Sequence, residues 1–204
     1  MTSGDDQDGE VSIRISRAGL FSRSLAFVGA LGGSALGAAK LAASSGSQHS
    51  PARDREILNL ALLIARLQTA FYAEALKGGQ LIGERHQFAS VVGPHERAHV
   101  KFLAAALGPH ASNAPRFQFG DATTDPNKFV STAESLESTS LGVYNGQAVN
   151  LTPQTLAAAA RIVSVEARHA AWARALAGKD PAPVAVDMPI SVSEAKSVLA
   201  PFLV

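Results

Sequence analysis

Glu96-Arg-Ala-His99 and Glu166-Ala-Arg-His169 are the two stretches that decide the fold of this 204-residue chain. In each stretch a glutamate and a histidine stand three residues apart, so on a helix both side chains lie on one face, about one turn apart. A buried carboxylate or imidazole is costly unless it is paired or binds a metal. Two such pairs therefore predict two helices whose polar faces meet at one site inside an apolar bundle.

The sequence around the two pairs predicts a bundle of four long helices. Apolar residues dominate from Pro51 onward, Gly and Pro residues interrupt the pattern, and no useful strand alternation is present. Asp54 is the predicted N-cap of the first helix. Four helices of about twenty residues joined by loops indicate an all-α bundle. The predicted helices cover residues 55–77, 87–107, 126–144 and 153–176.

The predicted polar positions repeat within the chain. Glu137 and Tyr144 stand seven residues apart on the third helix, and Tyr72 occupies the corresponding place on the first. Positions 65, 72, 96 and 99 recur 70 to 72 residues later as positions 137, 144, 166 and 169. The chain therefore reads as two copies of one helix pair, except that Ala65 stands where Glu137 has its carboxylate.

These residues are similar to the ferritin-like superfamily, and more narrowly to bacterial ferritin-like proteins related to plant desiccation-related proteins. The likeness covers about residues 51–204. It is carried by Ile57-Leu58-Asn59-Leu60 with Ala70-Phe71-Tyr72, by Glu96-Arg-Ala-His99-Val100, by Ala133-Glu-Ser-Leu-Glu137 with Gly142-Val-Tyr144, and by Ile162-Val-Ser-Val-Glu166-Ala-Arg-His169.

The resemblance implies a centre in which two single glutamates and two E-x-x-H pairs hold two iron or manganese ions. Carried over, the metal positions fall on Ala65, Glu96, His99, Glu137, Glu166 and His169, so one carboxylate is missing. The ion position served by Glu137, Glu166 and His169 is complete, and the one served by Ala65 is predicted to be impaired. Gln68 and Glu74 are poor replacements, since Gln68 is uncharged and Glu74 lies on another face.

A plain structural interpretation stands beside metal binding. The same five residues, Glu96, His99, Glu137, Glu166 and His169, can form a buried, hydrogen-bonded polar cluster with no ion. Tyr72 and Tyr144 are interpreted as core residues with satisfied hydroxyls. Four other polar side chains are interpreted as solvated: His86, His95, His110 and Glu134.

Residues 1–50 have the plan of an export signal. Arg14, Arg17 and Arg23 precede an uncharged run over residues 24–39, which Lys40 and a Ser/Gly stretch close. Sixteen uncharged residues fall short of the ~20 that span a bilayer, which favours a cleaved signal. Glycines at every fourth position suit close packing of membrane helices, so a retained membrane anchor is the alternative. Ser16-Arg17-Ala-Gly-Leu-Phe21 resembles a twin-arginine signal that lacks its second arginine. The predicted location is extracytoplasmic or anchored in the cytoplasmic membrane.

Composition narrows the function further. Eighteen Lys+Arg against seventeen Asp+Glu, with no basic stripe, exclude nucleic acid as a partner. The absence of Cys excludes thiolate metal sites and Cys nucleophiles. Residues 181–204, rich in Pro at their start, predict a mostly extended tail with one last helical turn at residues 193–199, packed on the bundle.

Two functions follow from the sequence. The first is an exported or tethered ferritin-like protein with an impaired iron or manganese site, related to stress or desiccation, with at most residual oxidase or peroxide-handling activity. The second is a non-catalytic subunit that uses the scaffold to bind a membrane or a protein complex. The missing carboxylate argues against turnover, and the oligomeric state is left open.

Overall fold

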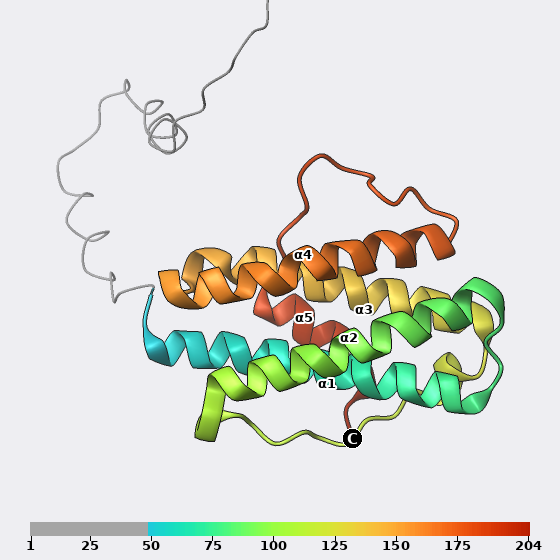
Figure 1. Ribbon diagram of the computed structural model, residues 1–204, viewed down its shortest axis with the longest axis horizontal. Coiled ribbons are helices and arrows are strands. Elements are labelled where there is room, and N and C mark those ends of the chain that lie inside the picture. The colour runs from blue at the N-terminus through green and yellow to red at the C-terminus, as the bar shows by residue number, and fades with distance from the viewer. Residues whose placement is uncertain (1–48) are drawn as a thin grey trace, which may run out of the picture. The chain divides into compact units, whose positions relative to one another are not determined.

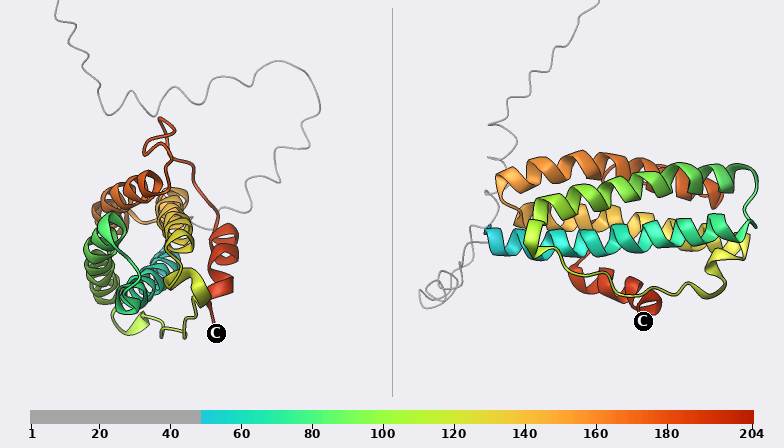
Figure 2. Two further views of the ribbon diagram at one scale, coloured as in Figure 1. Left: turned by 90° about the vertical axis from the view of Figure 1, so that its right-hand side faces the viewer. Right: turned by 60° about the horizontal axis from the view of Figure 1, so that its bottom comes forward.

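A computed structural model describes residues 49–204, so the predicted export or anchor segment lies outside the described residues. The four long helices run side by side as a bundle, and the short α5 lies outside it, next to α3 (Figures 1 and 2). No helix of this part of the chain has the length and apolarity needed to cross a bilayer. The helices are α1 (Pro51–Gly78), α2 (Gly83–Leu107), α3 (Pro126–Gln147), α4 (Pro153–Leu176) and α5 (Val192–Leu199).

The start of α1 differs from the prediction. Ser50 is the N-cap, since its hydroxyl accepts a hydrogen bond from the Arg53 amide at 3.1 Å, and Pro51 occupies the first helical turn. The prediction that Asp54 caps this helix is wrong. Asp54 is buried one turn inside α1, and its carboxylate accepts hydrogen bonds from the Thr152 amide at 2.9 Å and from the Thr152 and Thr155 hydroxyls at 2.5 Å. Asp54 therefore ties α1 to the beginning of α4.

Two further helix ends lie beyond their predicted positions. α2 begins at Gly83 rather than Gln87, and its N-cap, Ile82, makes no side-chain cap hydrogen bond, so this boundary carries no capping signal. α3 continues to Gln147, three residues past Tyr144. α2 continues through Pro94 as one helix.

An aromatic core fills the bundle at the end near the α1–α2 turn. Phe71 stacks on Phe129 with ring centroids 5.3 Å apart, and Tyr72 meets Phe88 edge to face at 5.7 Å. All four rings are fully buried. This core ends at the Tyr72 hydroxyl, and the polar site described below begins there.

The C-terminal tail crosses α3 where that helix carries glycines. Ile190 donates its amide to the Gly142 carbonyl at 3.0 Å. A Cβ added at Gly146 would lie 2.2 Å from the Ile190 carbonyl oxygen, so only glycine fits under the crossing. Beyond it α5 begins with a Ser191/Glu194 capping box and buries Ala195 and Leu199 against the bundle.

Candidate metal centre

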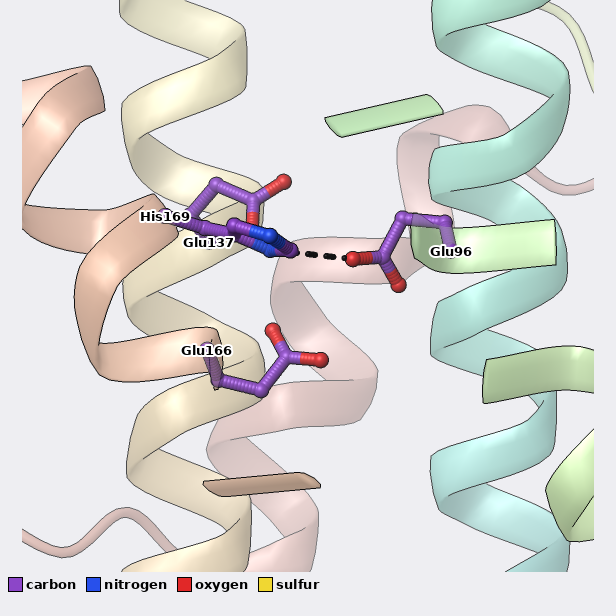
Figure 3. A group of neighbouring side chains, drawn as sticks. All are labelled: Glu96, Glu137, Glu166 and His169. Carbon is purple, nitrogen blue, oxygen red and sulfur yellow. Dashed lines mark ion pairs between the residues drawn. The ribbon is translucent and has the colours of Figure 1, made fainter. Parts of the chain in front are cut away.

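The five predicted site residues meet in the middle of the bundle. Glu96 and His99 come from α2, Glu137 from α3, and Glu166 and His169 from α4. All five are buried, and the three glutamates are at most 1% exposed. Figure 3 shows Glu96 reaching across from α2 toward Glu137, Glu166 and His169 on the other side.

Four side chains place ligand atoms close enough together to be a candidate metal site. Ligand atoms of Glu96, Glu137, Glu166 and His169 lie within 4.8 Å of one another. The His169 Nδ1 atom is 3.1 Å from Glu96 Oε1 and 3.4 Å from Glu137 Oε2. Metal–ligand bonds of about 2.1 Å that meet at a right angle place their ligand atoms about 3.0 Å apart. The two His169 distances therefore suit a transition-metal ion.

The same four side chains carry buried atoms that lack a hydrogen bond within the described residues. These atoms are Glu96 Oε1, Glu137 Oε2, Glu166 Oε2 and His169 Nδ1. The His169 contacts given above are ion-pair distances without hydrogen-bond geometry. Since buried polar atoms are nearly always satisfied, these four ligand-type atoms are candidates to bind an ion.

His99 stands to one side of this group. Its Nδ1 atom is 3.0 Å from Glu166 Oε1 and 3.3 Å from Glu96 Oε2. Burial lowers the pKa of His99, but Glu166 and Glu96 outweigh it and raise that pKa to about 9. His99 thus contacts two of the carboxylates as a cation.

The other titratable groups of the cluster also have shifted pKa values. Burial lowers the pKa of His169, yet Glu137 and Glu96 raise it to about 10. Burial, together with the charge of Glu96, raises the pKa of Glu166 to about 7, and burial likewise raises that of Glu137. The pKa of Glu96 is lowered because His169 and His99 outweigh its burial. Without an ion, the cationic His99 and His169 therefore supply the positive charge that faces the carboxylates.

The two halves of the internal repeat meet through a tyrosine. The Tyr72 hydroxyl, from the first half, donates a short hydrogen bond to Glu137 Oε1 of the second half. Tyr144, its counterpart, packs against the apolar cluster that contains Ala65. Ala65 has no carboxylate to accept a bond from it. The hydrogen bond that orients Glu137 thus has no equivalent at position 65.

Gln68 and Glu74 do not supply a carboxylate beside Ala65. Gln68, one turn along α1, is fully buried, and neither its amide oxygen nor its amide nitrogen has a hydrogen-bond partner among the described residues. Glu74 is exposed and accepts a hydrogen bond from the Thr123 hydroxyl at 2.7 Å, away from the site. The cluster thus contains three carboxylates, those of Glu96, Glu137 and Glu166.

His95 is the residue that sequence reasoning missed. It is exposed, as predicted, but its Nδ1 atom lies 2.9 Å from His169 Nε2 and the two rings stack at 5.2 Å. Its position directly before Glu96 was the only available signal. Glu134, also predicted to be solvated, is half-buried and pairs with Lys179 at 2.7 Å, whereas His86 and His110 are exposed.

The comparisons agree with this geometry. A family model described as a ferritin-like domain matches residues 53–179, more than half of the chain. The chain belongs to the ferritin-like domain family. The match begins two residues inside α1 and ends just past α4, so the ferritin-like domain contains all four bundle helices and all five site residues. Comparison with curated proteins gave no match.

Proposed function

We propose that this ferritin-like protein binds one transition-metal ion, iron or manganese, in the centre formed by Glu96, Glu137, Glu166 and His169. The observation that carries the proposal is the set of four buried, unpartnered ligand atoms, one from each of these side chains. Three carboxylates and an imidazole suit iron or manganese better than a soft thiophilic ion.

The chain's own residues have distinct tasks at this centre. Tyr72 fixes one oxygen of Glu137, which leaves Oε2 free to face the ion. His95 contacts the Nε2 atom of His169 through its own Nδ1 atom, so the Nδ1 atom of His169 faces the carboxylates. A bound iron or manganese ion would supply one-electron redox chemistry at the site.

We propose that the second ion position of the family is impaired. Ala65 supplies no ligand, and His99 already contacts Glu166 and Glu96, the carboxylates that a second ion would need. A second ion would have to displace a cationic imidazole and would gain no fourth carboxylate in return. The protein therefore binds one ion tightly and a second one weakly.

Metal analysis tests the proposal directly. Protein purified without chelator should contain close to one iron or manganese ion per chain, and saturating Mn²⁺ should raise the melting temperature of the metal-free form. Glu137→Gln should weaken Mn²⁺ binding at least tenfold. Glu134→Gln, one turn earlier on the same helix and outside the cluster, is the matched control. The proposal would be overturned if adding iron, manganese or zinc did not change the melting temperature of the wild-type protein.

We further propose that the protein acts outside the cytoplasm or at the cytoplasmic membrane, in the response to desiccation or related stress. The support is the arginine-led, uncharged run over residues 24–39 and the resemblance to desiccation-related proteins. Cell fractionation with intact-mass measurement tests the location: a cytoplasmic chain that keeps residues 1–50 would contradict it. Loss of the gene should lower survival of drying.

A non-catalytic subunit is the second candidate function. Its support is the missing carboxylate at Ala65, since the dinuclear chemistry of the family needs both ions. Under this function the protein would bind a membrane or protein complex and show no oxidase or peroxide-consuming activity. Activity assays on the iron-loaded and manganese-loaded forms separate the two: measurable turnover that Glu137→Gln abolishes would exclude it.

A further inference from the structure

A cavity of about 450 Å³ lies away from the carboxylate cluster, where α1, the segment after α2 and α5 meet. Figure 2 shows these three parts of the chain on one side of the bundle. A volume of this size is within the ~300–1,000 Å³ that is typical of small-molecule sites. The ferritin-like metal centre uses none of its lining residues.

The inner surface of the cavity is apolar. Ile57 and Leu60 of α1 are buried there, and Leu63, Pro115 and Val192 are half-buried around them. This surface excludes a small hydrated ion as the occupant and favours a molecule with a hydrocarbon body.

The remaining lining is cationic. Arg53, Arg66 and Lys196 line the cavity together with a single acidic residue, Glu56, which leaves a surplus of two positive charges. Arg53 is paired with Glu56 at 2.8 Å. Lys196 has no hydrogen bond or ion pair among residues 49–204. Within the described part of the chain, Lys196 is thus a lining cation that has no partner.

Hydrogen bonds hold the walls in place without a ligand. Asn59 donates to the His110 carbonyl at 3.0 Å and accepts from the Ser112 amide at 2.8 Å. Arg66 donates to the Ser112 carbonyl at 2.5 Å. On the other side, α5 is held by its Ser191/Glu194 capping box and by the burial of Ala195 and Leu199. Because both walls are tied, binding would not have to order them first.

We propose that this cavity binds an amphipathic carboxylate of the size of a medium-chain fatty acid. Its hydrocarbon chain would lie on Ile57, Leu60 and Val192, and its carboxylate would face Lys196 and the unused donors of Arg66. A neutral apolar molecule would leave the charge surplus uncompensated, and a polyanion such as a nucleotide would place charge on the apolar surface.

Calorimetric titration with decanoate tests this proposal on the metal-free protein. Wild type should bind one decanoate per chain, whereas acetate and the neutral 1-decanol should bind at least tenfold more weakly. Lys196→Glu should weaken decanoate binding tenfold or more. Lys101→Glu, an exposed lysine on α2 outside the cavity, should leave it unchanged. Should Lys196→Glu lower the melting temperature, Lys196→Gln removes the charge without reversing it.

A second variant tests the volume instead of the charge. Ser112 lines the cavity, and both of its ties to α1 use backbone atoms. Ser112→Trp should therefore fill the space, keep the ties and abolish decanoate binding. The proposal is overturned if decanoate does not saturate, or if Lys196→Glu and Ser112→Trp bind it like wild type. Glu137→Gln should bind decanoate normally, so this result is independent of the metal centre.

Discussion

His95 Nδ1 lies 2.9 Å from Nε2 of His169, so a surface histidine contacts the far side of a buried one. A metal-binding imidazole needs a free electron pair on the nitrogen that faces the ion, and a hydrogen-bond acceptor on its other nitrogen selects that tautomer. His95 is placed to be this acceptor. It links the protein surface to the centre through a single hydrogen bond.

His95→Leu should therefore weaken Mn²⁺ binding by about 10- to 100-fold, the usual effect of losing such a supporting partner. His95→Gln keeps an acceptor and should retain most of the affinity. His110→Leu, at another exposed histidine, is the control. Isothermal titration with Mn²⁺ measures all three, and equal affinities for the Leu and Gln variants at position 95 would show that the hydrogen bond does not matter.

Ala65→Glu should restore the second ion position. The new carboxylate would lie in the apolar cluster against which Tyr144 packs, as Glu137 lies by Tyr72. Binding stoichiometry should rise from about one ion per chain to two. Because an unpaired buried charge is costly, the metal-free variant should melt below wild type and recover on metal addition.

Two further variants test the placement at position 65. Ala75→Glu, also on α1 and fully buried, should lower the melting temperature without recovery on metal addition. Adding Tyr144→Phe to Ala65→Glu should remove part of the gained affinity. An unchanged stoichiometry in Ala65→Glu would mean that α1 does not present position 65 to the ion.

Metal affinity should increase as the pH rises from 6 to 8. An ion must expel the protons of the cluster. The pKa values of about 10 for His169 and about 7 for Glu166 mean that His169 is protonated throughout that range and that Glu166 is mostly protonated over its lower half. Each released proton contributes about a tenfold change in affinity per pH unit. Mn²⁺ titrations at three pH values measure the slope, and a flat profile would contradict this assignment of the protons.

The metal-free protein should lose stability over the same range and above it. A pKa raised to about 9 on His99 and about 10 on His169 gives stabilisation that is complete below pH 6.5 and lost as the pH rises through those values. Glu166, with its pKa raised to about 7, acts in the same direction. The lowered pKa of Glu96 acts in the opposite direction, but only below pH 4.5. The melting temperature should fall between pH 6 and 9, and less so with saturating Mn²⁺.

Asp54→Ala should cost about 2–3 kcal/mol of unfolding free energy, because it removes a buried carboxylate that accepts three hydrogen bonds at the start of α4. Urea unfolding measures the loss. Glu56→Ala, two residues later and exposed, should change stability by less than about 0.5 kcal/mol. Equal losses in the two variants would show that the tie between α1 and α4 is not stabilising.

The helices and the convergence of the glutamates and histidines were predictable because both follow from local spacing. Helical period places Glu96 with His99 and Glu166 with His169, and burial requires the two faces to meet. Asp54 was misassigned because its role depends on Thr152, a residue 98 positions away that local capping rules do not consider. His95 was missed for the same reason, since its partner lies on another helix.

Each tyrosine of the repeat lies beside the site position of the other half: Tyr72 beside Glu137, and Tyr144 beside Ala65. This arrangement affects how the centre responds to a substitution. Glu137 accepts its hydrogen bond from Tyr72 of the opposite half. A substitution at position 65 therefore leaves this hydrogen bond in place. The loss at Ala65 leaves only Tyr144 without its counterpart. Under the proposed one-ion function, this crosswise arrangement lets the ion position at Glu137 keep its geometry although position 65 offers no carboxylate.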